Sequence, residues 1–449
     1  MKVSRDKYLI YDIFIIGFAM FAIFFGAGNL IFPPYIGFEA GSGWLPALMG
    51  VLLTGMLLPV LAVVAIGLGG GSFERLAKPV APWFGTVIIL ISMVIISWLI
   101  ITPRTAGVSF ETGVMTLFPK TDPKIGSMIF IPAYFLAALY FAIDQNQVID
   151  KVGRILTPFL LILLVIIVLW AVIAPLDQPT AAGKPNPFYF GFITGYQTGD
   201  VFTGLIFGII FVDAIKSKGY IKTKDYMPVL IGAAAITFLG LFIVYGGLEY
   251  LGATGRNLFP ADISKSQLLS ELVNRLAGNL GAKTLAVAVI LACLTTAIGA
   301  ITTMSRYMEK WSYGWLSYKQ SVIITTVVSA FQAYGGVEYI VSMAGPIFML
   351  FYPVGICLVV LGILSPFFSN DGIWKGVAVF ALLIGLYDSL NILSEMAGFT
   401  IPVKIQTLYQ MIPLSSSGFA WLLPSITGGL IGGILWKIMR MPNMGYEFE

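Results

Sequence analysis

Three short polar stretches interrupt long apolar runs of this sequence, and they contain the residues best suited to bind a ligand. The first is GAGN, Gly26 to Asn29, inside the run that begins near Ile13. The second is YQTGD, Tyr196 to Asp200, and the third is the threonine pair, Thr295 and Thr296. Their backbone, amide, hydroxyl and carboxyl groups donate and accept hydrogen bonds. We therefore ask which ligand such groups would hold.

Several kinds of catalysis are excluded by composition. The chain contains no histidine, so Ser-His-Asp triads, HExxH zinc sites and histidine proton relays are absent. It has neither a P-loop lysine motif nor a GxGxxG motif that follows a strand. Both cysteines, Cys293 and Cys357, lie in apolar runs and predict no disulfide framework. We expect no enzyme activity, no organic cofactor and no nucleic-acid partner.

The class of protein follows from hydrophobicity. Of the 449 residues, 58% are hydrophobic and 11% are charged, whereas charged residues make up about a quarter of a soluble globular chain. Runs of about twenty apolar residues recur, each long enough to cross a bilayer as a helix. We predict an all-α integral membrane protein with about twelve transmembrane helices. The predicted spans cover residues 10–35, 44–68, 82–103, 126–146, 155–175, 191–213, 227–250, 282–304, 319–340, 342–364, 373–393 and 418–438.

Orientation is predicted from the loops. The basic start is followed by no cleavage pattern, so the first span is expected to be retained, ending at Pro33 and Pro34. The loop KSKGYIKTK, residues 216–224, is the strongest indication of a cytoplasmic side. We predict a multi-pass protein of the bacterial cell membrane with both termini in the cytoplasm. An amphipathic helix over the outer surface is predicted from one apolar face, formed by Leu268, Leu269, Leu272 and Leu276.

Spans one and six are both interrupted by glycine and polar residues. Five spans separate their starts, so the two segments enter the membrane from opposite sides. Such a pair of broken spans is typical of secondary transporters built from inverted repeats. The alternative is that the glycines only allow helices to pack closely, which is common in membranes.

A helix that breaks in lipid leaves backbone groups that need partners. Freed amides near Gly28 would present a positive helix end to a carboxylate. Freed carbonyls at Ala22 and Phe25 are oxygen ligands suited to a small cation. The threonine pair and the carbonyl of Ala292 could complete the oxygen shell of this cation, or the two hydroxyls could bond back to the preceding helical turn.

Asp200 also has two interpretations. A carboxylate inside a span is costly and marks a pathway or an ion site, but it could also cap the second half of span six. Both roles are compatible. Arg104 and Glu111 are expected near the outer mouth, in a solvated loop or, as the alternative, as a gating ion pair. Exposed charges are expected at span ends for Glu249, Glu338, Asp388 and Glu395.

Four motifs resemble those of the bacterial branched-chain amino acid:cation symporter family, the BrnQ-type carriers. They are FGAGNLIFPP, TPRTAGVSFETG, GYQTGDVFTGLIFGIIFVDAI and CLTTAIG. The resemblance covers nearly the whole chain in order. It implies the LeuT-type fold, with five helices in residues 1–176, an inverted five in residues 177–365, and two further helices in residues 366–449. It also implies import of leucine, isoleucine and valine with sodium by alternating access.

The resemblance also implies the site. Substrate contacts fall on Gly26, Ala27, Gly28, Asn29, Tyr196, Gln197, Thr198, Gly199 and Asp200. Sodium ligands are the carbonyls of Ala22, Phe25 and Ala292 and the hydroxyls of Thr295 and Thr296. Asn29 is similar to a residue of a second sodium site in some relatives, but no partner in span six is evident.

The coupling ion is the least determined part of the prediction. Span five contains no ionisable residue, whereas some proton-coupled relatives of this fold carry a lysine there. This absence favours sodium, and Asp200 keeps a proton-coupled amino acid carrier as the alternative. An ion channel or an intramembrane enzyme is a more distant alternative, because no repeated pore filter and no nucleophile–base pair is visible. The remaining expected partner is membrane lipid.

Overall fold

Helices form the secondary structure of the computed structural model, which describes residues 5–143, 148–181, 183–367 and 369–443. No strand occurs within these ranges, so the all-α prediction is confirmed for them. The first half contains α1 (Arg5–Phe24), α2 (Ala27–Ala40), η1 (Gly41–Gly43), α3 (Trp44–Val51), η2 (Leu52–Leu57), α4 (Leu58–Leu68), α5 (Phe73–Ala77), α6 (Phe84–Met93), η3 (Val94–Ile101), α7 (Thr102–Val108), η4 (Ser109–Val114), α8 (Met115–Leu117), α9 (Pro123–Ile143), α10 (Val148–Ile173), α11 (Pro187–Tyr196) and α12 (Asp200–Ser217). The second half contains α13 (Thr223–Thr254), α14 (Lys265–Trp311), α15 (Tyr318–Ala333), α16 (Gly336–Leu364), η5 (Ser365–Phe367), α17 (Asp371–Ala397), α18 (Val403–Gln410), η6 (Ser415–Ser417) and α19 (Leu422–Ile438).

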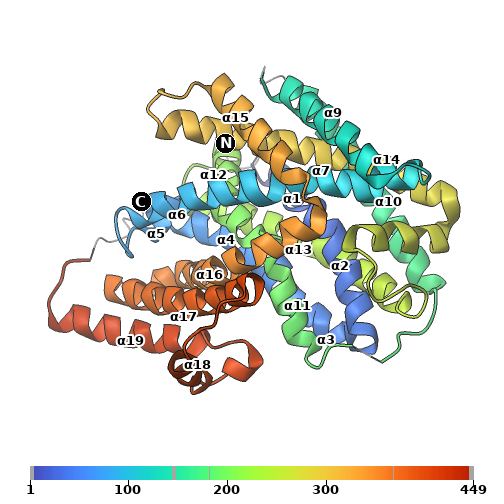
Figure 1. Cartoon of the computed structure of the whole chain (residues 1–449). Helices are drawn as coiled ribbons and strands as arrows, with labels where there is room; N and C mark the ends of the chain where they lie inside the picture. The colour runs from blue at the N-terminus through green and yellow to red at the C-terminus, as the bar shows by residue number, and fades with distance from the viewer. Residues whose placement is uncertain (1–4, 144–147, 182, 368, 444–449) are drawn as a thin grey trace.

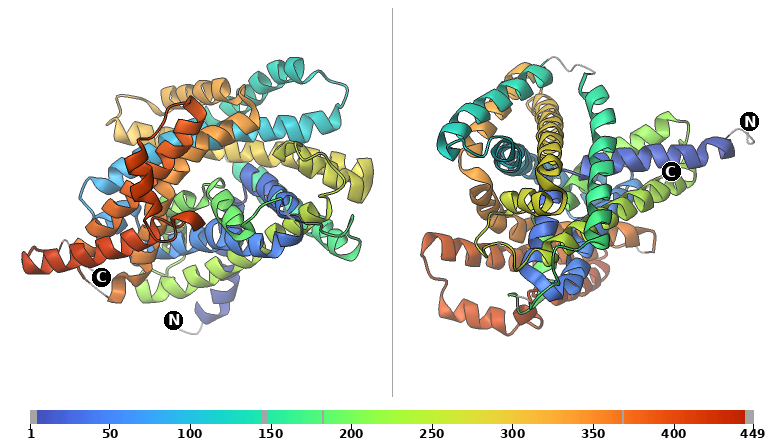
Figure 2. Two further views of the ribbon diagram at one scale, coloured as in Figure 1. Left: turned by 60° about the horizontal axis from the view of Figure 1, so that its bottom comes forward. Right: turned by 90° about the vertical axis from the view of Figure 1, so that its right-hand side faces the viewer.

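The helices are arranged around a buried centre. Figure 1 shows α1, α2, α12 and α13 in the middle of the molecule, with α9 and α15 on one side and α17, α18 and α19 on the other. Both further views keep the C-terminal helices, in red, away from α9, in teal (Figure 2). The interrupted helices α1–α2 and α11–α12 therefore lie where other helices can supply partners for their freed backbone groups.

Fewer helices meet the length and composition of a membrane span than the twelve that the sequence predicts. Seven helical stretches of the described chain are long and apolar enough to span a membrane, or eight if the bent pair α11–α12 counts as one. Each of the twelve predicted ranges overlaps a helix, and α19 (Leu422–Ile438), with 17 residues, is at the short end of the length that a bilayer requires. The count of twelve stays a prediction, and the end of the predicted range 126–146 lies outside the described residues.

Two boundaries differ from the sequence prediction. Pro33 and Pro34 lie inside α2, which continues to Ala40, so the predicted end of span one was wrong. Prolines are tolerated within membrane helices where neighbouring helices support the freed backbone groups. The predicted amphipathic helix is the first part of α14, which bends at Gly278, where φ is +69°. Its face of Leu268, Leu269 and Leu272 is buried.

Close helix packing relies on glycine at particular crossings. α2 and α13 interlock because Gly37 lies against the backbone of Glu249 and Gly252 lies against the backbone of Pro34. α17 and α19 approach in the same way, through Gly376 and the carbonyl of Gly428. A side chain at any of these crossings would push one helix away from the other.

We predict that Gly252→Ala destabilises the protein by about 1–3 kcal/mol, because the new methyl group overlaps the backbone of α2. Thermal unfolding of the detergent-purified protein measures the loss. Gly246→Ala on the same helix is the matched control, since its Cβ would lie 3.6 Å from the side chain of Leu48, an ordinary contact. Equal melting temperatures for the two variants would contradict this packing.

Candidate functional site

The first helix break lies between α1 and α2. Gly26 is extended there, with φ −107° and ψ −170°. Its N–H donates to the carbonyl of Phe24 at 3.0 Å and to Oδ1 of Asn29 at 3.3 Å. In the described part of the chain, no backbone amide outside the helices donates to the carbonyl of Ala22 or Phe25. Two carbonyl oxygens are thus left for a ligand.

The second break separates α11 from α12, whose axes differ in direction by 44°. Gly199 lies at the break with φ +77°, a left-handed conformation that glycine adopts without steric cost. The hydroxyl of Thr198 donates to the carbonyl of Gly195 at 2.9 Å and accepts from the N–H of Asp200 at 3.3 Å. Gly199 is the N-cap residue, so the carboxylate of Asp200 does not cap α12 and is left for another partner.

Asn29 connects the two breaks. Its Nδ2 donates to Oδ2 of Asp200 at 2.7 Å and also to the hydroxyl of Tyr245 on α13. All three side chains are buried, and Asp200 is 4% exposed. Asp200 is therefore the residue of span six to which Asn29 is hydrogen-bonded.

Arg104 on α7 fills the space between the two breaks. Its guanidinium donates from Nη1 to the carbonyl of Gln197 at 2.6 Å and from Nη2 to the carbonyl of Thr198 at 3.4 Å. On the opposite side it lies against Gly28, where a Cβ would be 2.8 Å from Nη2. The residue is 2% exposed, so the predicted position in a solvated outer mouth was wrong. The predicted third span ends at residue 103, directly before Arg104, whereas the helical stretch continues to Leu117.

Aromatic and aliphatic side chains line the other side of the second break. Tyr352 on α16 accepts from the N–H of Val201 at 3.4 Å, and its ring stacks on Tyr196 at 4.2 Å. Phe348 and Ile101 lie closest to Gly199, within 4.0 Å of where its Cβ would be. Tyr196 was selected from sequence. Tyr352, Phe348 and Ile101 were not, because they become its neighbours only in the folded chain.

The threonine pair lies beside the first break. A Cβ at Gly26 would be 3.8 Å from Cγ2 of Thr296. Both hydroxyls donate to the carbonyl of Ala292, Thr295 at 2.9 Å and Thr296 at 3.0 Å. This is the bonding to the preceding turn that the sequence analysis left open. A hydroxyl that donates once keeps lone pairs, so the oxygens are still able to coordinate a cation.

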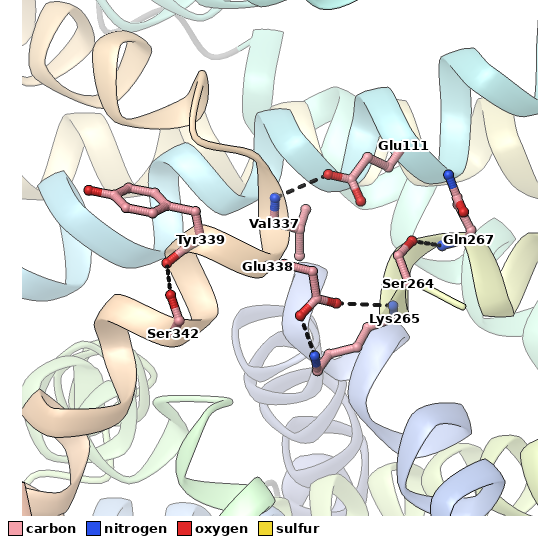
Figure 3. A network of polar contacts seen from close by, with 8 residues as sticks. All are labelled: Glu111, Ser264, Lys265, Gln267, Val337, Glu338, Tyr339 and Ser342. Atoms are coloured by element: carbon pink, nitrogen blue, oxygen red, sulfur yellow. Dashed lines mark hydrogen bonds and ion pairs between the residues drawn. The ribbon is translucent and has the colours of Figure 1, made fainter. Parts of the chain in front are cut away.

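A second polar cluster joins four elements, α2, η4, α14 and α16, and Figure 3 shows its members on η4, α14 and α16. Lys265 at the start of α14 forms an ion pair with Glu338 on α16, and its Nζ lies 4.5 Å from the centre of the Tyr35 ring on α2. Glu111 on η4 accepts from the N–H of Val337 at 3.1 Å. We call this set, Lys265, Glu338, Tyr35, Glu111 and Val337, the latch.

Two other charged residues differ from the sequence expectation of exposed span ends. Glu249 on α13 is 0% exposed, and neither carboxyl oxygen has a hydrogen-bond partner among the described residues. Asp388 on α17 is half-buried and accepts from the hydroxyl of Tyr409 at 2.5 Å. Both predictions of solvated carboxylates were wrong, because the helices extend beyond the predicted spans or pack more closely than hydropathy indicates.

Solved structures place this architecture in a known class. The chain is similar to MhsT in complex with L-phenylalanine, with a TM-score of 0.55 and 15% identity over 84% of this chain and 97% of that chain. It is also similar to Mhp1, a nucleobase-cation-symport-1 family transporter, in a closed conformation, with a TM-score of 0.53 and 14% identity over 95% of this chain and 91% of that chain. The molecule is an all-helical membrane protein with the LeuT-like transporter fold.

Sequence comparison narrows the class to a family. Residues 10–439 match the family described as branched-chain amino acid transport protein, and the chain belongs to this family. It is 37% identical to the branched-chain amino acid permease BraB of Bacillus subtilis, over 94% of this chain and 95% of the relative. It is 34% identical to the branched-chain amino acid transport system 2 carrier protein of Pseudomonas aeruginosa, over 96% and 98%. The predicted family is confirmed, and this is a family of transporters rather than enzymes.

We predict that Arg104→Met abolishes most transport without unfolding the protein. Methionine has a similar length but leaves the carbonyls of Gln197 and Thr198 without their charged donor. Hydrogen bonds to charged groups contribute about 1.5–3 kcal/mol, so uptake of labelled leucine should fall roughly 10- to 100-fold. Arg104→Lys keeps the charge but loses the planar pair of donors. Its leucine uptake should therefore lie between that of the wild-type protein and that of Arg104→Met. Full uptake by Arg104→Met, at equal amounts of protein in the membrane, would rule out this role.

Proposed function

We propose that the chain is a sodium-coupled symporter that imports leucine, isoleucine and valine by alternating access. The observation that supports this most directly is the meeting of two broken helices, with the threonine pair beside the first break. The freed groups at the two breaks differ in sign. Amides and Arg104 provide positive partners, and Asp200 with the freed carbonyls provides negative partners, as a zwitterionic amino acid requires.

The substrate carboxylate would bind at the start of α2. The N-terminal amides of a helix carry partial positive charge, and Gly26, Ala27 and Gly28 leave room for a ligand to approach them. Arg104 adds a full charge beside Gly28, and its buried Nε has no partner among the described residues. An unpaired buried donor is costly. A substrate carboxylate at this position would accept from Nε of Arg104 and remove that cost.

The substrate ammonium would bind at the second break. The carboxylate of Asp200 is the acceptor we propose for it, and Asn29 holds Asp200 in place. The aliphatic side chain would then lie against Phe348 and Ile101, which border Gly199. Apolar side chains around a few convergent polar groups are the usual composition of a small-molecule site.

Sodium would bind between α1 and α14, with ligands from the carbonyls of Ala22, Phe25 and Ala292 and the hydroxyls of Thr295 and Thr296. A cation there connects the first break to α14. Its binding would stabilise the same break that holds the substrate carboxylate, so sodium should raise substrate affinity and substrate should raise sodium affinity by the same factor.

Alternating access is supported by the latch. With both termini in the cytoplasm, the start of α14 and the start of α16 lie on the outer side, where the Lys265–Glu338 ion pair joins them (Figure 3). On this topology, the latch holds α14, α16 and α2 together on the outer side. In the proposed arrangement, residues 1–176 and 177–365 are inverted repeats, residues 366–449 add two helices, and the chain crosses the membrane twelve times.

A proton-coupled carrier of the same fold is the second candidate, because Asp200 is a buried carboxylate at the substrate site. Leucine uptake into proteoliposomes under separately imposed gradients distinguishes the two. We expect an inward sodium gradient to drive accumulation and a proton gradient alone to drive none. Accumulation driven only by protons would overturn the proposed coupling ion.

We predict that Thr295→Ala combined with Thr296→Ala removes most sodium-dependent uptake, because two of the five proposed ligands are lost. The half-saturating sodium concentration for leucine uptake should rise at least about tenfold, since each charge-assisted contact contributes about 1.5–3 kcal/mol. The matched control is Thr302→Ala with Thr303→Ala, a second threonine pair on α14. Unchanged sodium dependence in the first double variant would show that the ion binds elsewhere.

A further inference from the structure

Three buried side chains from three helices meet beside the second break. They are Asn29 on α2, Asp200 on α12 and Tyr245 on α13, and Tyr245 is 0% exposed. Nδ2 of Asn29 donates to Oδ2 of Asp200 at 2.7 Å and to the hydroxyl of Tyr245. The side chains of Tyr245 and Asp200 are also hydrogen-bonded. The proposed function uses Asn29 and Asp200 but assigns no role to Tyr245.

The orientation of the Asn29 amide is determined from both ends. An ionised carboxylate only accepts hydrogen bonds, so the group of Asn29 that faces Asp200 is its NH2. The N–H of Gly26 only donates, so the group that faces Gly26 is the carbonyl oxygen Oδ1. The NH2 group has two protons, and its partners are Asp200 and Tyr245. The oxygen of the Tyr245 hydroxyl therefore accepts a hydrogen bond from Asn29.

The proton of the Tyr245 hydroxyl consequently needs an acceptor. Asn29 provides none, because its NH2 only donates and its carbonyl oxygen faces Gly26. The carboxylate of Asp200 is the acceptor that interacts with this hydroxyl. Hydrogen bonds to an ionised acceptor are roughly twice as strong as those between neutral groups. Tyr245 therefore donates to Asp200 and closes a ring of three hydrogen bonds.

The same contacts determine where the Asp200 carboxylate points. Its two side-chain donors, Asn29 and Tyr245, belong to α2 and α13, whereas Asp200 belongs to α12. Within the described ranges, neither lysine nor arginine forms an ion pair with Asp200. An ionised carboxylate has about four acceptor positions, so two donors leave positions for a substrate ammonium.

The ring of Tyr245 is itself held in place by packing. Leu241, Val244 and Leu248 on the same helix are fully buried in the same apolar cluster. On the opposite helix, a Cβ at Gly55 would lie 3.5 Å from Cε2 of Tyr245. Because closely packed interiors hold side chains in defined rotamers, the Tyr245 hydroxyl is a fixed donor. Support of this kind is what a binding group needs to keep one geometry.

We propose that Tyr245 is a positioning residue for substrate binding: its hydroxyl, together with Asn29, fixes the Asp200 carboxylate in the direction that receives the substrate ammonium. The inference rests on the proposed function for the placement of the ammonium at Asp200. Tyr245 acts through Asp200 and not by contact with the substrate. Without the hydroxyl, the carboxylate keeps one side-chain donor and must be ordered by the ligand, which lowers affinity.

The test is thermal unfolding of the detergent-purified full-length protein in sodium over a titration of leucine. A ligand that binds only the folded state raises the melting temperature by mass action, so one measurement gives both stability and affinity, even for weak binding. Tyr245→Phe keeps the ring and removes the hydroxyl. Its dissociation constant for leucine should rise at least about tenfold, because a charge-assisted contact is lost.

Tyr226→Phe is the matched control on the same helix. The hydroxyl of Tyr226 donates to the carbonyl of Gly67 at 2.7 Å, and the residue is buried. Each variant removes one buried hydrogen bond, so both should lower the melting temperature without leucine. The leucine affinity of Tyr226→Phe should equal that of the wild-type protein. Unchanged affinity in Tyr245→Phe, or an equal loss in both variants, would overturn the positioning role.

A double-mutant cycle measures whether Tyr245 acts through Asp200. In the Asp200→Asn background the carboxylate is absent, so Tyr245→Phe should cause little further loss of leucine affinity. The same fold-loss from Tyr245→Phe in both backgrounds would mean that the hydroxyl acts independently of Asp200, and it would overturn the inference.

The outcomes separate this inference from the proposed function. Unchanged affinity in Tyr245→Phe together with weakened affinity in Asp200→Asn would overturn the inference and leave the ammonium site supported. Wild-type affinity in Asp200→Asn would overturn the proposed ammonium site and the inference with it. Binding that depends on both residues, without leucine accumulation in proteoliposomes, would overturn the proposed transport and support the positioning role.

Discussion

The hydrogen bond from Asn29 to Asp200 joins two helices that each stop and restart among apolar side chains. A helix break inside a membrane leaves amides and carbonyls that water cannot reach, and each unsatisfied group costs several kcal/mol. Here freed backbone groups find partners within their own break or in Arg104: the N–H of Gly26 donates to Asn29, and the carbonyls of Gln197 and Thr198 accept from Arg104. The bond from Asn29 to Asp200 joins the side chains of the two breaks. The site region therefore depends on packing between the first and second halves of the chain.

Arg104 extends the same constraint to a third element. It donates to two carbonyls that are free to accept only because α11 ends at Tyr196. The guanidinium has room at this position only because residue 28 is glycine. The guanidinium is buried against these carbonyls, and the opposite charge of the Asp200 carboxylate also acts on it. The glycines of span one therefore serve two purposes, access to helix amides and space for the arginine.

Sequence patterns reveal the parts of this arrangement that are local in the chain. GAGN and YQTGD stand out because glycine and polar residues interrupt apolar runs, and the structure brings both stretches together. The threonine pair is visible for the same reason. Arg104 was misplaced because hydropathy ends the third span just before it, although α7 and η4 continue the helix to Val114. Tyr245 and Glu249 could not be selected either, because their burial depends on how α13 packs against α2. No single stretch of sequence shows which residues of two distant helices will face each other.

The C-terminal helices illustrate the same limit and connect it to function. Residues 366–449 lie outside the two predicted repeats, and the sequence suggests no role for them beyond two more spans. In the fold, α17 and α18 provide Asp388 and Tyr409 to a cavity that also borders Tyr196 and Gln197. Tyr196 and Gln197 therefore border both this cavity and the second break, where the carbonyl of Gln197 accepts from Arg104.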